Sequence, residues 1–293
     1  MRVLLDTVIW GCELGLITLS LSLSFALVGY ANFALLELTG VGAYLALTFS
    51  EFAPLPLAAA LAVACCGLLA VLLNTAVFRH LQTASIAAKM LVSIAVAFVI
   101  RALVQLVWGT GGRFFDIDPL PITTIGGVFI TRAQVAVVAT TLVALIVFHT
   151  LLRHTRFGRA LQATAESPTL AEVRGVNSQR VIAGAWFLAG GLASLGGVLY
   201  GMDTFVQPSM GFTLIIPVFA AAVVGGMGSL YGAVLGAFLL SFFQNAVINV
   251  DLGDFLGLGS WVVGTQYKAA VAMVALVLML LVRPRGMLGR GTA

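Results

Sequence analysis

The chain has 293 residues, of which 61% are hydrophobic and 9% are charged. This composition lies outside the range of soluble globular domains and predicts an integral membrane protein. The formal net charge of +4 is small, and the basic residues are dispersed among apolar runs, which argues against nucleic acid as a partner.

A helix of about 20 apolar residues crosses a lipid bilayer. By this measure the sequence predicts seven spans, and the apolar segment 213–249 is long enough for two more. The seven spans lie near residues 5–29, 33–50, 56–79, 83–107, 133–152, 181–202 and 265–282. We therefore expect one all-α membrane domain over residues 1–293, a polytopic bundle of about eight or nine spans.

An ionisable side chain inside a span is costly and marks a functional candidate. Glu37 lies in the second predicted span, after Asn32 and close to Gly40 and Gly42. Small residues let a backbone or a solute approach closely. Two interpretations stay open: Glu37 faces a solute pathway, or it is a charge near the cytoplasmic end of the span that reaches the interface or pairs structurally.

Two further ionisable residues lie inside predicted spans. Arg101 lies about one and a half turns from the outer end of its span, and Glu13 is expected at a comparable depth. The pattern is consistent with a Glu13–Arg101 ion pair. It is equally consistent with each side chain reaching the membrane interface alone.

Arginine collects in two places and predicts the orientation of the chain. By the positive-inside rule, the segment that carries Arg153, Arg156, Arg159, Arg174 and Arg180, and the tail that carries Arg283, Arg285 and Arg290, are cytoplasmic. The segments 109–126, 203–212 and 250–264 belong on the other side because they carry mostly acid: Asp116, Asp118, Asp203, Asp251 and Asp254 against Arg113. Nine crossings would then put the N-terminus outside.

The cytoplasmic segment 153–180 contains the signals of a short helix. Ser167 followed by Pro168 is a typical N-cap and first helical residue, and Gly175 provides a left-handed stop. These signals predict a helix over 168–174. So short a helix is marginal in water, and its apolar edge of Leu170, Val173 and Ala171 favours packing against a partner. The alternative is a loop that only joins two spans.

The apolar segment 213–249 is interrupted by GGMGSLYG at 225–232. Four glycines in this stretch predict a turn at membrane depth, either between two spans or between re-entrant halves packed inside protein. Pro217 predicts a kink or a broken helix, a feature of binding sites in membrane transport proteins.

Catalysis, metal binding and nucleotide binding have no support in the sequence. The cysteines and histidines form no CxxC or HExxH pattern, which gives no reason to expect a disulfide framework or a metal site. Glu166 and Glu172 share a segment without a His or Cys at useful spacing. No GxxxxGK[ST] motif occurs, so any energy source must come from elsewhere.

The stretch GRALQATAESPTLAEVRGVNSQRV at 158–181 resembles the cytoplasmic coupling loop of permeases in the branched-chain amino acid ABC importer family. The matching positions are Gly158, Arg159, Ala160, Ala165, Glu166, Ala171, Gly175, Val176 and Asn177. Further motifs agree in order: NFALLELTGVGAY at 32–44, GGLASLGGVLYG at 190–201, Pro208, Gly211, AAVVGGMGSLYGAVLGA at 221–237, and RPRGMLG at 283–289. The similarity is greatest to the H-type permease.

This resemblance implies a multi-pass subunit of the bacterial inner membrane that translocates a branched-chain or other neutral amino acid. It implies four kinds of partner: the bilayer, a second related permease in a heterodimer, two cytoplasmic ATPase subunits that carry ATP and Mg²⁺, and a periplasmic binding protein. No cofactor is expected in this chain. The implied coupling residues are Arg159, Ala165, Glu166, Ser167, Leu170, Glu172, Val173 and Gly175, and the implied pathway residues are Asn32, Glu37, Gly40, Tyr44, Pro217, Gly225 and Gly226.

One departure from the family pattern affects the expected solute. Leu35 and Leu36 stand where H-type permeases often have His-Gly, which favours a more apolar solute. The alternative function is a self-contained secondary transporter or channel for a small organic solute. Such a protein needs no docked helix and would be expected to carry more acids or histidines inside its spans.

Overall fold

The computed structural model describes residues 2–116, 121–125, 128–249, 264, 267–283 and 286–288. These residues form an all-helical polytopic membrane protein with one small hairpin. The long helices are α1 (Arg2–Val28), α3 (Leu55–Ala76), α4 (Ile86–Trp108), α5 (Arg132–His154), α8 (Ser178–Asp203) and α10 (Leu230–Asn249). The shorter elements are α2 (Ala34–Ser50), the 3₁₀-helix η1 (Phe78–Leu81), α6 (Arg156–Glu166), α7 (Pro168–Val173), α9 (Met210–Gly225) and α12 (Lys268–Val282).

The predicted apolar segments recur as helices. In the described part of the chain, six helices are long and apolar enough to cross a membrane, and α2, α9 and α12 are shorter apolar helices. The segment 213–249 divides into α9 and α10. The acidic segment 250–263, Asp118, Arg285 and Arg290 lie outside the described residues.

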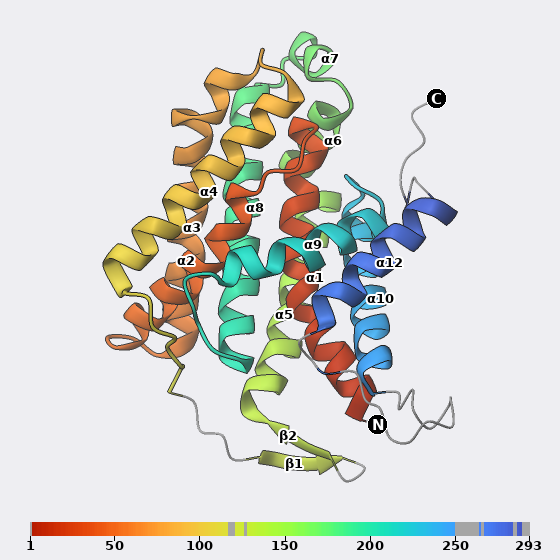
Figure 1. The fold of residues 1–293 in the computed structure, drawn as a ribbon. Helices are drawn as coiled ribbons and strands as arrows, with labels where there is room; N and C mark the ends of the chain where they lie inside the picture. Colours follow the sequence, from red (N-terminus) through yellow and green to blue (C-terminus); the bar gives the residue numbers. More distant parts are fainter. Residues whose placement is uncertain are drawn as a thin grey trace.

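Helices α1 and α8 form the centre of the bundle (Figure 1). In its most apolar 18-residue window α1 is 78% buried and α8 is 67% buried, whereas α4 is only 22% buried. Small residues permit this packing. A Cβ on Gly197 of α8 would lie 2.1 Å from the carbonyl oxygen of Thr39 on α2, and one on Gly190 would lie 2.7 Å from that of Cys66 on α3.

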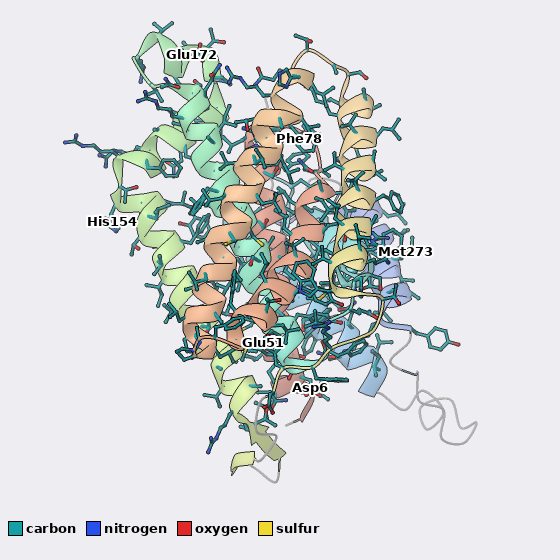
Figure 2. All side chains as sticks on the ribbon, turned by 90° about the vertical axis from the view of Figure 1, so that its left-hand side faces the viewer. Asp6, Glu51, Phe78, His154, Glu172 and Met273 are labelled. Atoms are coloured by element: carbon teal, nitrogen blue, oxygen red, sulfur yellow. The ribbon has the colours of Figure 1, made fainter. Side chains whose placement is uncertain are left out.

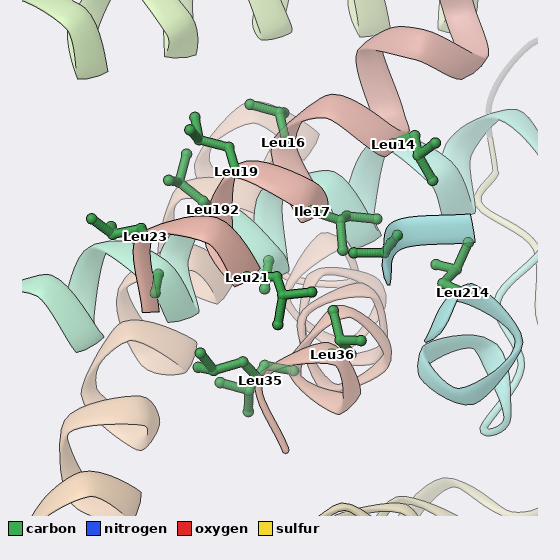
Figure 3. Packing of buried hydrophobic residues seen from close by; sticks show 14 of the residues in the cluster. Leu14, Leu16, Ile17, Leu19, Leu21, Leu23, Leu35, Leu36, Leu192 and Leu214 are labelled. Carbon is green, nitrogen blue, oxygen red and sulfur yellow. The ribbon is translucent and has the colours of Figure 1, made fainter. Parts of the chain in front are cut away.

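Leucine side chains fill the space around α1 (Figure 3). Leu14, Leu19 and Leu21 are buried although they point in different directions around the helix. A helix that is apolar on all sides is one that is enclosed by other helices. Leu35 and Leu36 at the start of α2 are also fully buried in this cluster.

The bundle has two different ends. Helices α6 and α7 lie at one, which we call the α7 end, and the antiparallel hairpin of β1 (Pro121–Ile125) and β2 (Val128–Thr131) lies at the other, which we call the hairpin end (Figure 1). Figure 2 shows Glu172 at the α7 end, and Asp6 and Glu51 at the hairpin end. The N-terminus lies at the hairpin end.

Two elements were not predicted. The hairpin lies in a segment that we expected only to connect two spans, although β-branched residues on either side of a Gly-Gly pair are a typical hairpin signal. Helix α6 lies in the segment expected to hold a single helix. Its signals are local: the Thr155 side chain accepts a hydrogen bond from the Gly158 N–H at 3.1 Å, and Leu161 and Thr164 form a buried face.

The glycine-rich segment is a turn between two helices. Helix α9 ends at Gly225 and α10 begins at Leu230. Gly226 and Gly228 have φ values of +103° and +82°, which favour glycine. The segment is therefore a turn between α10, which is long enough to cross a membrane, and the shorter apolar helix α9. No re-entrant region is seen among the described residues.

Candidate functional site

Helix α2 begins inside the protein. Asn32, just before the helix, is fully buried, and its Oδ1 accepts a hydrogen bond from the Ala34 N–H at 3.0 Å. The Phe33 N–H donates to Ser93 Oγ of α4 at 3.3 Å. These bonds satisfy backbone groups that a buried helix start would otherwise leave unpaired. Glu37 lies in the first turn of α2, where the helix dipole favours a negative charge.

Glu37 forms a buried ion pair with Arg101 of α4. The Glu37 side chain is 1% exposed and that of Arg101 is 14% exposed. The guanidinium carbon of Arg101 lies 5.1 Å from the centre of the Phe98 ring and 4.5 Å from that of Phe212, both favourable cation–π distances. The charge of Arg101 is thus compensated on several sides.

This arrangement contradicts both alternatives for Arg101, an ion pair with Glu13 and a side chain that reaches the membrane interface alone. Arg101 projects from α4 towards α2, so its partner is Glu37. Glu13 lies on α1 and lines a cavity bounded by α8 and α12. Glu37 is paired, as one interpretation of it supposed, and its part in solute passage stays a prediction.

The first turn of α9 packs directly on Glu37. A Cβ on Gly211 would lie 2.6 Å from the Leu36 carbonyl oxygen and 2.8 Å from Glu37 Cα, so only glycine permits this contact. The rings of Phe33 and Phe219 lie 6.4 Å apart. Figure 1 shows α9 running obliquely across the bundle from this contact.

The predicted pathway residues divide into three groups. Asn32 and Glu37 lie at the start of α2, and Pro217 is buried within the facing helix α9. Gly40 faces open space, since nothing lies within 4 Å of a Cβ placed there. The others lie apart: the Tyr44 hydroxyl donates to the Gly111 carbonyl at 3.4 Å, and Gly225 and Gly226 lie at the opposite end of α9 from Glu37.

The predicted caps of α7 are confirmed. Ser167 Oγ accepts a hydrogen bond from the Leu170 N–H at 3.3 Å, and Pro168 is the first helical residue. Gly175 has a φ of +81°. Its N–H donates to the Glu172 carbonyl and the Val176 N–H donates to the Ala171 carbonyl, which together form a Schellman motif. The helix ends at Val173, one residue earlier than predicted.

The predicted apolar edge of α7 is partly correct. Leu170 is 66% exposed and Val173 is 81% exposed, whereas Ala171 is 2% exposed and anchors the helix to the bundle. Arg159, Glu166 and Glu172 are exposed nearby, and Ala165 and Ser167 are half-buried. The structure therefore presents two large apolar side chains on a small helix rimmed by charge.

A cavity of about 460 Å³ separates α6 from the turn between α9 and α10. Ala165 and Glu166 of α6 line one side, Gly228 and Ser229 of the turn line another, and Phe25 closes it from α1. The segment after α12 also reaches this turn. The Met287 and Leu288 N–H groups donate to the Val224 and Gly225 carbonyls, each at 3.0 Å.

Sequence reasoning assigned Arg101 incorrectly and overlooked the capping role of Asn177. Arg101 was considered with the wrong partner, because its pairing depends on how α2 packs against α4. Asn177 caps α8 by accepting a hydrogen bond from the Arg180 N–H at 3.1 Å. An Asn before an apolar helical run is a local capping signal that would have identified it.

Comparisons with known proteins show the family of the chain. A family model described as the branched-chain amino acid transport system permease component matches residues 3–283. The permease protein BraD of the high-affinity branched-chain amino acid transport system of Pseudomonas aeruginosa is 35% identical over 57% of this chain and 51% of its own length. A probable branched-chain amino acid transport permease protein LivH of Methanocaldococcus jannaschii is 27% identical over 98% of this chain and 92% of its own.

The chain spans about half the length of BraD and of the similar permease protein LivH of Escherichia coli. Among solved structures, PsaBC from Streptococcus pneumoniae in complex with Fab matches with a TM-score of 0.53, 14% identity, 97% coverage of this chain and 93% of that chain. At this identity the likeness concerns the fold alone.

Proposed function

Since the chain belongs to the branched-chain amino acid transport system permease family, we propose that it is the membrane permease of an ATP-driven importer of a small neutral amino acid. The observation that carries this proposal beyond the family is α7: a short helix capped at both ends that presents Leu170 and Val173 outside the bundle. A self-contained transporter has no use for such a helix.

The proposed partners follow from what this chain lacks and from what it presents. Its sequence has no P-loop, so ATP and Mg²⁺ bind to two cytoplasmic ATPase subunits. A periplasmic binding protein delivers the solute. A second, related permease completes the path as a heterodimer.

The α7 end is the cytoplasmic end in this proposal, and α2, α9 and α12 lie in the bilayer with the six longer helices. This arrangement agrees with the exposed arginines at the α7 end. It gives the nine membrane segments that the sequence allows and puts the N-terminus outside.

Coupling begins at α7. Leu170 and Val173 enter a groove of the ATPase, with Arg159, Glu172 and Glu166 around them. The Ser167 and Gly175 caps keep the short helix formed, so that movement of the ATPase displaces it as a unit. Helix α6 contacts α8 and α1, and closure of the cavity between Ala165 and the glycine turn would carry the displacement to that turn.

The moving part within the membrane is then α9. Its glycine turn lies beside α6, and its first turn rests on Glu37. Tilting α9 about this contact would change the spacing at Gly40, Pro217 and the start of α2, which form the candidate pathway. ATP occupancy biases the population of inward-open and outward-open states, and each state binds the solute-loaded receptor differently.

The solute class is proposed as branched-chain amino acids. Leu35 and Leu36, the positions at which this chain departs from the family pattern, are both fully buried in the leucine cluster. They therefore act on solute choice through the packing of α2 and not by direct contact.

Co-extraction tests the proposal. The chain carries a C-terminal tag in its native membrane, is extracted in mild detergent, and its companions are identified by mass spectrometry. We expect two ATP-binding proteins and a second permease. A chain that purifies alone in several detergents, and still moves solute in ATP-free liposomes, would contradict the proposal and favour a self-contained transporter.

A further inference from the structure

A second cavity, of about 200 Å³, lies near the hairpin end between α1, α5, α8 and α12. We call it the Glu13 cavity. Its polar lining includes Asp6 and Glu13 of α1, Gln134 of α5, Asp203 of α8 and Lys268 of α12. Cavities for drug-sized ligands measure about 300–1,000 Å³, so this one fits a smaller solute.

Glu13 is the unusual member of the lining. Glu13 is 1% exposed, and its Oε1 has no hydrogen-bond partner in the described part of the chain. A buried carboxylate oxygen without a partner is costly. The cavity is the space into which a compensating donor would fit.

The neighbouring polar groups are already engaged with one another. Trp10 Nε1 donates to Gln244 Oε1 at 2.6 Å, and Gln244 Nε2 donates to the Lys268 carbonyl at 2.9 Å. Gln134 Oε1 accepts a hydrogen bond from the Thr131 N–H at 3.2 Å. The walls are thus held in place, whereas Glu13 lines the cavity and its Oε1 has no hydrogen-bond partner among the described residues.

The charges favour a positive ligand. The lining contains three acidic side chains, those of Asp6, Glu13 and Asp203, and one ammonium group, that of Lys268. No three acidic, His or Cys side chains among the described residues are grouped to hold a metal ion. An organic cation fits better, because the Trp10 and Tyr200 rings, 5.6 Å apart, offer faces that attract ammonium groups.

We propose that the Glu13 cavity binds the primary ammonium group of a small amino acid, with the Glu13 carboxylate as its acceptor and Trp10 beside it. Lys268, whose Nζ lies 5.5 Å from the centre of the Trp10 ring, is placed to attract the carboxylate of the same zwitterion. That the ligand is an amino acid rests on the proposed function; that the cavity takes an ammonium group rests on its own residues.

Trp10 provides the measurement. The chain, with whatever partners it retains, is placed in lipid nanodiscs, and tryptophan fluorescence is followed during titration with three probes. These are leucine, 3-methylbutylamine, which is leucine without its carboxylate, and 4-methylpentanoate, which is leucine without its ammonium group. We expect saturable changes with leucine and 3-methylbutylamine, none with 4-methylpentanoate, and loss of the signal in Trp10→Phe.

Two matched variants locate the acceptor. Glu13→Gln removes the negative charge from the cavity, and we expect the half-saturating concentration to rise about tenfold or more, as when a hydrogen bond to a charged group is lost. Glu51→Gln makes the same change at an exposed acid of the same end, outside the cavity lining. It should leave the titration unchanged.

The outcomes separate this inference from the proposed function. Binding of 4-methylpentanoate alone, or an unchanged titration in Glu13→Gln, would overturn the ammonium site even if ATP-dependent uptake is intact. If Glu13→Gln does not fold, the three probes on the unaltered protein still decide. Binding of 3-methylbutylamine by a chain that purifies without ATPase partners and still moves leucine in ATP-free liposomes would support the site and contradict the importer.

Discussion

The side chain of Arg101 connects three helices. It pairs with Glu37 of α2, and its guanidinium lies between Phe98 of its own helix and Phe212 of α9. Removing one member of a buried ion pair leaves the other charge uncompensated, which costs about 3–5 kcal/mol, whereas replacing both with apolar side chains is often nearly neutral. The pair therefore orders the contact of α2 with α4 and α9 more than it adds stability.

A double-mutant cycle tests whether the charges of Glu37 and Arg101 depend on each other. Glu37→Leu and Arg101→Leu are each expected to lower the thermal midpoint of the detergent-extracted protein strongly, and the double variant should recover most of the loss. Size-exclusion chromatography after heating measures the folded fraction. Additive losses in the double variant would show that the two charges do not depend on each other.

Two glycines on the α2–α8 side of the bundle differ in what surrounds them. A Cβ on Gly197 would lie 2.1 Å from the Thr39 carbonyl oxygen, whereas one on Gly40 would meet nothing within 4 Å. Gly197→Ala should therefore destabilise the protein by about 1–3 kcal/mol through overpacking.

Gly40→Ala is the matched control for Gly197→Ala. It should leave the thermal midpoint unchanged or slightly higher, because Ala is more favourable than Gly in a helix by up to about 1 kcal/mol. The same heating assay compares the two variants. Equal destabilisation by both would contradict the difference in packing.

Helix α7 is defined by the capping interactions at its two ends. The Ser167 cap and the Schellman motif at Gly175 keep six residues helical, which sequence propensity alone would not do. Gly175→Val places a β-branched residue at a φ of +81°, where a left-handed conformation costs roughly 1–2 kcal/mol.

We expect Gly175→Val to insert normally, to retain ATP hydrolysis by the assembled complex, and to lose most ATP-driven uptake. The control is Gly111→Val, since Gly111 has no positive φ and nothing lies within 4 Å of its Cβ position. Uptake at the unaltered rate by well-inserted Gly175→Val would contradict a coupling role for the cap.

The apolar edge of α7 makes a separate prediction about assembly. Leu170→Asp puts a charge where a partner's apolar groove is proposed and should reduce the ATPase recovered with the tagged chain at least severalfold. Ala163→Asp adds the same charge at an exposed position of α6 and should not. Quantitative mass spectrometry of the extracted complex gives the ratio, and equal recovery in both variants would argue against docking through α7.

Elements defined by local signals could be predicted from the sequence, and contacts between distant elements could not. Ser167, Pro168 and Gly175 determine the ends of α7 within a few residues of one another, so the pattern was sufficient. The Arg101 partner depends on which helix α4 faces, and the Glu13 cavity exists only because four helices meet there. Thr155 and Asn177 had local capping signals that were overlooked.

In the whole molecule, the two regions that we propose to be functional, the cavity beside α6 and the Glu37–Arg101 pair, lie at opposite ends of α9. Its glycine turn adjoins the cavity beside α6, and its first turn rests on the Glu37–Arg101 pair in the interior. The oblique helix (Figure 1) thus links the end that faces the proposed ATPases to the start of α2. We propose that this arrangement is the physical basis of an importer in which this chain supplies part of the path and ATPase subunits supply the energy.

Uptake by the reconstituted complex tests this account most directly. The extracted complex is placed in liposomes with the binding protein and labelled leucine on one side and ATP with Mg²⁺ on the other. We expect accumulation of leucine that requires both ATP and the binding protein and that is mostly lost in Gly175→Val. Accumulation without ATP, driven by an ion gradient or by the leucine gradient alone, would contradict it.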